Sequence, residues 1–114
     1  MSDCIFCKIA EKKIPAAAVF EDDEIFAFND VNPQAPVHIL IIPKKHIPSV
    51  MDLKDKDREL IGKIHLVAQA LAVKEKVSET GFRLIVNNGP DAGQAVGHLH
   101  FHLLGKRKLG WPPG

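Results

Sequence analysis

Three histidines alternate with apolar residues toward the carboxyl end of the chain, at His98, His100 and His102. Because successive side chains of a β-strand point to opposite faces, this spacing predicts three imidazoles on one face of a strand. The intervening Leu99 and Phe101 then point into the core. With an ordinary pKa of about 6.5, an imidazole can serve as acid, base, nucleophile or metal ligand near neutral pH. The segment is therefore expected to carry chemistry rather than to be a mere solvated strand.

The loop before these histidines contains Gly89, Gly93 and Gly97. Such glycines allow backbone N–H groups to converge on an anion. A glycine loop alone is usually a plain turn, but next to three histidines it indicates a phosphate held beside imidazoles. Attack by an imidazole on phosphorus would divide a hard displacement into two easier steps, and a neighbouring histidine would protonate a leaving amine.

The remaining elements must position this segment. One long helix is expected over residues 53–77, since Ile64, Val67 and Leu71 recur at helical spacing. A short helical turn and five strands are predicted at residues 4–13, 17–21, 25–29, 37–42, 82–87 and 98–104, in that order. We expect a single α+β domain over residues 1–114, an antiparallel meander with the helix across one face.

Charge and composition restrict the class of ligand and the cellular location. The 15 Lys and Arg residues nearly cancel the 14 Asp and Glu residues, so the basic field that long nucleic acid requires is missing and a small ligand is expected. No apolar stretch approaches the roughly 18 residues of a membrane span, and signal-peptide features are lacking at the start. We expect a cytoplasmic protein without membrane association. There, Cys4 and Cys7 are free thiols, a redox pair or half of a metal site rather than a structural disulfide.

The pattern His98-x-His100-x-His102, followed by two leucines, resembles the histidine triad motif. Residues 5–9, 33–38, 42–46 and 110–114 are also similar to that family, so the resemblance covers nearly the whole chain and is closest to the Hint branch, the histidine triad nucleotide-binding proteins. It implies a HIT-like fold, a five-stranded antiparallel sheet with one long helix, extended across a homodimer. The implied activity is hydrolysis of the P–N bond of purine nucleoside 5′-phosphoramidates, such as AMP-lysine, through a nucleotidyl-histidine intermediate.

The resemblance also implies a role for individual residues. His100 corresponds to the nucleophile, His102 to the histidine that contacts phosphate and assists the leaving group, and His38 to a fourth histidine that orients the nucleophile. The implied nucleotide-binding residues are Asp30 for the ribose, Asn87, Gly93, Gln94, Ala95 and Val96 for the phosphate, Phe6, Ile9, Ile14, Phe28, Val31 and Leu40 for the purine, and Trp111, which reaches the partner subunit's site.

A structural zinc ion is implied as well. Relatives with the amino-terminal cysteine pair bind zinc through four residues, which here are Cys4, Cys7, His46 and His98. Structural zinc favours four tetrahedral cysteine and histidine ligands. No cofactor is expected in catalysis itself, because the nucleophile has to stay free of metal.

Two positions depart from the family pattern. Ala95 stands where many relatives carry Ser or Thr, whose hydroxyl contacts the phosphate or the leaving group, and Gly97 replaces a bulkier residue. The missing hydroxyl keeps open the alternative of a zinc-stabilised nucleotide-binding module with little turnover. A dinucleoside polyphosphate hydrolase, which shares the triad and the nucleophile, is a second alternative. The Trp111 ending favours the Hint side.

Overall fold

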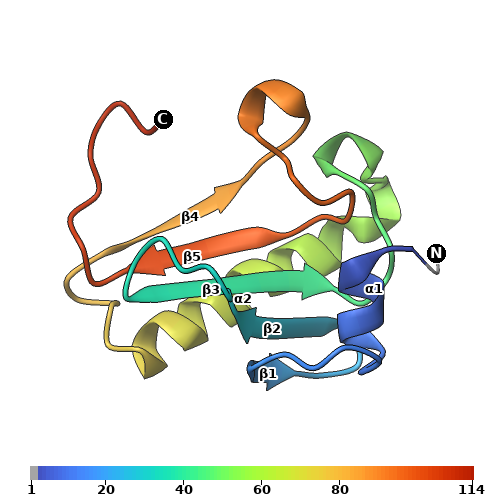
Figure 1. Ribbon diagram of the computed structural model, residues 1–114, viewed down its shortest axis with the longest axis horizontal. Coiled ribbons are helices and arrows are strands. Elements are labelled where there is room, and N and C mark those ends of the chain that lie inside the picture. Colours follow the sequence, from blue (N-terminus) through green and yellow to red (C-terminus); the bar gives the residue numbers. More distant parts are fainter. Residues whose placement is uncertain (1–2) are drawn as a thin grey trace.

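In residues 3–114, which a computed structural model describes, the chain forms five strands and two α-helices (Figure 1). Their bounds are α1 Ile5–Ala10, β1 Ala18–Glu21, β2 Ile25–Asn29, β3 Val37–Pro43, α2 Arg58–Lys74, β4 Phe82–Val86 and β5 Phe101–Gly105. Short 3₁₀ turns occupy Val50–Asp52, Asp55–Asp57 and Pro90–Ala92. The predicted α+β class, a five-stranded antiparallel sheet with one long helix, is confirmed.

The strand order in the sheet is β1-β2-β3-β5-β4, and all neighbours are antiparallel. The predicted meander is therefore wrong in its last two strands, because β5 lies between β3 and β4. Burial explains the exchange: four of the five residues of β5 are buried, whereas β4 has none that is fully buried. The more apolar strand takes the interior position, and β4 is left at the edge.

The two faces of the sheet are covered by different helices. In β2, Ile25 and Ala27 pack toward α2, while Phe26 and Phe28 belong to a second apolar cluster with α1. The alternation in β3 is the same, with Ile39 toward α2 and Leu40 on the opposite face. In Figure 1, α2 crosses the far side of the sheet and α1 lies at the ends of β2 and β3. Since α1 is only six residues long, it can cover only part of its face of the sheet.

Several predicted boundaries differ from the structure, and for two of them the hydrogen bonds show the cause. The helix predicted over residues 53–77 spans only Arg58–Lys74. The side chain of Asp57 accepts the N–H of Lys54 at 2.9 Å and a bond from Lys45 Nζ at 2.6 Å, and this holds a 3₁₀ turn before the helix. The strand predicted at 98–104 begins at Phe101, because the Leu99 N–H donates to the Ile47 carbonyl at 2.7 Å, outside the sheet ladder. Within the described part, no helix is long and apolar enough to cross a membrane.

Candidate active site

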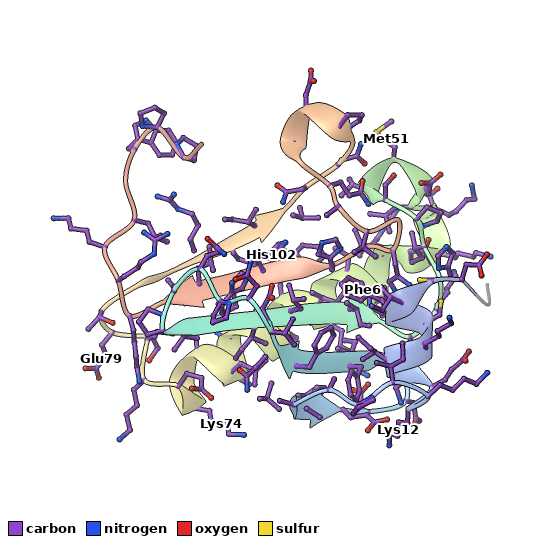
Figure 2. The ribbon with its side chains drawn as sticks, in the orientation of Figure 1. Phe6, Lys12, Met51, Lys74, Glu79 and His102 are labelled. Carbon is purple, nitrogen blue, oxygen red and sulfur yellow. The ribbon has the colours of Figure 1, made fainter. Side chains whose placement is uncertain are left out.

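The side chains of His38, His100 and His102 form a row on the face of the sheet that carries α1. The rings of His38 and His102 are 5.2 Å apart between centroids, and those of His100 and His102 are 5.1 Å apart. Phe6 of α1 closes the other end of the row, 5.1 Å from the ring of His100. Figure 2 shows His102 and Phe6 on this face. The structure thus brings the three predicted catalytic histidines together, drawn from β3, β5 and the segment before β5.

The position of the proton on His100 follows from its hydrogen bond. Nδ1 of His100 lies 2.7 Å from the carbonyl oxygen of His98. A carbonyl oxygen only accepts, so Nδ1 carries the hydrogen and donates it. The lone pair of the neutral imidazole is then on Nε2. His100 therefore has the tautomer that a nucleophile acting through Nε2 requires.

A second chain of hydrogen bonds determines the tautomer of His102. The N–H of Gln34 donates to Nδ1 of His38 at 2.9 Å, so the hydrogen of neutral His38 is on Nε2. That Nε2 lies 2.9 Å from Nδ1 of His102, which accepts, and the hydrogen of His102 is left on its own Nε2. The sequence led us to expect that His38 orients the nucleophile. Its hydrogen-bond partner is His102 instead, since the two residues come from adjacent strands.

Burial keeps the imidazoles of His38 and His102 neutral. It is the main cause that lowers the pKa of His102 to about 4, followed by the neighbouring His100 and His38, while Asp30 acts in the opposite direction. Burial also lowers the pKa of His38, opposed by the Asp30 carboxylate, whose Oδ2 lies 3.4 Å from Nε2. At pH 7 both rings are uncharged, and the tautomers derived above are the relevant ones.

The loop of residues 88–97, called the phosphate loop because it is predicted to bind phosphate, offers fewer free donors than expected. The N–H of Gly93 donates to the Pro90 carbonyl at 3.0 Å, and that of Gln94 donates to the Gly89 carbonyl at 3.1 Å. The backbone N–H groups of Ala95 and Val96 make no hydrogen bond to any part of residues 3–114. Of the predicted backbone donors from Gly93 to Val96, only those of Ala95 and Val96 can bind an anion without the loss of an existing hydrogen bond.

The predicted purine wall is largely assembled. Phe6, Ile9, Phe28 and Leu40 are buried in the apolar cluster under α1, and Ile14 packs against it. Ile9 and Ile14 also line a cavity of about 300 Å³ together with Phe26 and Pro15. A cavity of about 670 Å³ lies elsewhere, between Lys76 and the basic turn Lys106–Lys108.

Four other predicted nucleotide-binding residues lie outside this cluster. Val31 is 97% exposed and Trp111, on the carboxyl-terminal tail, is 84% exposed. Asn87 is half-buried directly after β4. Asp30 is half-buried beside His38, and its Oδ1 accepts the N–H of Asn32 at 2.8 Å, which leaves Oδ2 toward the histidine row.

The four predicted metal ligands form a separate cluster at the amino-terminal end of α1. Nδ1 of His98 lies 3.3 Å from Sγ of Cys4 and 3.5 Å from Sγ of Cys7, and Nδ1 of His46 lies 3.3 Å from Sγ of Cys7. The two Nδ1 atoms are 3.2 Å apart. All four ligand atoms lie within 4.8 Å of one another, so the cluster could hold a metal ion.

The chemistry of the cluster fits a tetrahedral zinc ion. Zn–S bonds of about 2.3 Å and Zn–N bonds of about 2.0 Å separate neighbouring ligand atoms by roughly 3.3–3.8 Å in a tetrahedron. Nε2 of His98 donates to the Pro43 carbonyl at 2.8 Å, so its Nδ1 lone pair points at the sulfurs. Burial, and then the adjacent Cys4, raise the pKa of Cys7 to about 11, an effect that a cation between the two sulfurs would offset.

Sequence reasoning did not identify Gln34, whose backbone determines the tautomer of His38. Its N–H donates to His38, and its carbonyl accepts a bond from Nε of Arg107 at 2.8 Å. A backbone group has no signature in the residue types, so only the fold could reveal it. The same holds for the carbonyl of His98, which orients His100.

Comparison with known proteins relates this geometry to other chains. The HIT domain family model matches residues 11–109. An uncharacterized HIT-like protein of Synechocystis sp. is 50% identical over 112 residues, which cover 98% of this chain and 97% of that protein. A HIT family hydrolase from Legionella pneumophila superposes with a TM-score of 0.97 at 54% identity, covering 98% of this chain and all of that one. A histidine triad nucleotide-binding protein from Candida albicans superposes with a TM-score of 0.86 at 34% identity, covering 96% of this chain and 83% of that one.

Proposed function

Because the chain belongs to the HIT domain family, we propose that it is a purine nucleotide-binding hydrolase of the Hint branch that cleaves the P–N bond of nucleoside 5′-phosphoramidates. The observation that carries the proposal is the tautomer of His100, whose Nδ1–H is bound by the His98 carbonyl at 2.7 Å. This hydrogen bond leaves the Nε2 lone pair for attack on phosphorus.

In the first step, Nε2 of His100 forms a bond to phosphorus, and the P–N bond breaks. The leaving amine takes its proton from solvent, because neutral His102 would become an imidazolate if it lost its Nε2–H. That N–H instead donates a hydrogen bond to a phosphate oxygen or to the leaving nitrogen. In the second step, a water oxygen bonds to phosphorus and the His100–phosphorus bond breaks, which releases the nucleoside monophosphate. The proton of that water passes to solvent, which balances the proton taken up by the amine.

The surroundings of His100 match the parts of a nucleoside monophosphate. The free N–H groups of Ala95 and Val96 would donate to phosphate oxygens, and Asn87, which directly follows β4, would supply a further donor. Oδ2 of Asp30 would accept the ribose hydroxyls, and the apolar cluster around Phe6 and Leu40 would take the purine. Ala95 adds no hydroxyl, so binding at the phosphate depends on backbone donors.

We further propose that Cys4, Cys7, His46 and His98 hold a structural zinc ion. Zinc, when bound, would cross-link α1 to the segments after β3 and before β5, and would supply no step of the reaction. Reduced cysteines as metal ligands suit the cytoplasm, where we place the protein.

A homodimer is supported by the edge strand. Phe82 and Val86 of β4 are 42% and 37% exposed, and alternation puts both on the α2 side of the sheet with Leu84, which packs on the core. An unpaired edge with uncovered apolar side chains is a surface for pairing with another strand. A second copy, joined edge to edge through β4, would extend the sheet and cover these side chains.

Steady-state release of amine from a fluorogenic adenosine phosphoramidate tests the function. Wild type should turn over, and His100→Ala should lose at least about 10³-fold in kcat while it still folds and binds AMP. His65→Ala, which removes an imidazole on α2 outside the site, is the matched control. A well-folded wild type that binds AMP without turnover would favour the nucleotide-binding module, and selective cleavage of dinucleoside polyphosphates would favour the other hydrolase.

A further inference from the structure

The side-chain amide of Gln94 is fully engaged inside the phosphate loop. Its Oε1 accepts the N–H of Gly89 at 2.9 Å, and its Nε2 donates to the carbonyls of Pro48 at 2.9 Å and Val96 at 3.0 Å. Both amide hydrogens are thus used. The side chain is not free to bind a nucleotide, although the residue lies in the middle of the glycine-bearing loop.

These bonds attach the loop to the segment that follows β3. Two other bonds join the same regions: the N–H of Met51 donates to Oδ1 of Asn88 at 3.0 Å, and the N–H of Leu99 donates to the Ile47 carbonyl at 2.7 Å. The turn Pro90–Ala92 lies beside the turn Val50–Asp52 in Figure 1, and Figure 2 shows Met51 at this junction. Besides its bond to Pro48, the Gln94 side chain also makes hydrogen bonds within the loop, to Gly89 and Val96.

The backbone is held on both sides of Ala95. On one side, the N–H of Gln94 is bound by the Gly89 carbonyl at 3.1 Å, and on the other, the Val96 carbonyl is bound by the Gln94 amide. Between these points lie the two N–H groups that make no hydrogen bond within residues 3–114, those of Ala95 and Val96. A short segment fixed at both ends presents its donors in one geometry, which lowers the cost of ordering them around an anion.

We propose that Gln94 is a positioning residue for the phosphate, which it serves by holding the Ala95 and Val96 N–H groups in place. The proposal rests on the proposed function, since it takes the phosphate of a nucleotide as the anion. The role of Gln94 matters more in this chain than it would with a hydroxyl at position 95, because Ala95 leaves the backbone N–H groups to bind the phosphate without a side-chain donor.

The test compares AMP with adenosine, which lacks the phosphate, by isothermal titration calorimetry. Gln94→Met keeps the length of the side chain and removes all three hydrogen bonds. We expect at least about a tenfold loss of AMP affinity with unchanged adenosine affinity, and in phosphoramidate turnover a rise in KM larger than the fall in kcat. Gln69→Met, on the exposed side of α2, is the matched control and should change neither ligand.

Equal AMP affinity in wild type and Gln94→Met would overturn the proposal and leave the proposed function intact. An equal loss for AMP and adenosine would also overturn it, since it would indicate a general loosening of the fold. Wild type that binds no AMP would instead refute the proposed function. If Gln94→Met fails to fold, hydrogen exchange of the Gly89 amide in the wild type provides the test. AMP should slow this exchange more than adenosine does, and equal effects of the two ligands would contradict the proposal.

Discussion

The imidazole of His102 makes the free energy of unfolding depend on pH. Its pKa is about 4 in the folded chain, whereas an unfolded chain gives histidine its ordinary value of about 6.5. Between these values the unfolded chain binds a proton that the folded chain does not bind. The stability contributed by neutral His102 is therefore fully present above about pH 7 and is lost as the pH falls through 6.5 toward 4.

The size of the effect follows from the two pKa values. At pH 5 the unfolded imidazole is almost fully protonated and the folded one only slightly, so folding loses about 2 kcal/mol relative to pH 7.5. That is a large share of the 5–15 kcal/mol, roughly, that typical domains have. The cause is the half-buried position of His102 between His38 and His100, where a positive charge is poorly solvated.

His102→Asn isolates this contribution, because the Asn Oδ1 can still accept the His38 Nε2–H while the side chain cannot titrate. Urea unfolding at pH 7.5 and pH 5.0, with the same excess of zinc for both proteins, gives the two differences in free energy. Wild type should lose about 2 kcal/mol more than the variant between these pH values. Equal losses would refute the reasoning and mean that the folded His102 accepts a proton as easily as the unfolded one.

Three further changes test other parts of the structure. With zinc at 100 times its Kd, wild type should gain about 2.7 kcal/mol of stability in thermal unfolding, and Cys7→Ser should gain almost none; an equal gain would place the metal elsewhere. Ala95→Ser should raise kcat/KM for a phosphoramidate by about tenfold or more, since it adds a hydrogen bond to a charged group; an unchanged value would mean that the side chain at position 95 does not contact the reacting phosphate. Phe82→Glu should give a folded monomer in light scattering, because it puts a charge on the exposed edge strand; a persistent dimer would point to a different interface.

The alternation of residue types predicted the two-faced sheet well. In β3, His38 and Leu40 lie on the site face and Ile39 lies against α2, as a period of two requires. The triad obeys the same rule, since Leu99 and Phe101 are in the core under α2. These features depend on local spacing, which a single sequence contains.

Long-range features could not be predicted in the same way. The position of β5 between β3 and β4 depends on the relative burial of two strands far apart in the chain. The bond between Gln94 and Pro48 joins residues 46 positions apart, and the His38 bond to His102 joins residues 64 positions apart. The helix began later than its apolar pattern suggested, because the Asp57 side chain stabilises the preceding turn. In each case a tertiary contact overrides a local preference.

The carbonyl of His98 has a consequence for how this chain can change over evolution. Every amino acid supplies a carbonyl, so the bond that keeps the hydrogen on Nδ1 of His100 does not require a particular side chain at position 98. The imidazole of His98 is thereby left to the cysteine-containing cluster. The tautomer proposed for nucleophilic attack thus depends on the path of the main chain, and substitutions among the candidate metal ligands would not move the proton. A lineage that loses the cysteines would retain this tautomer of His100 as long as another contact keeps the segment before β5 on the same path.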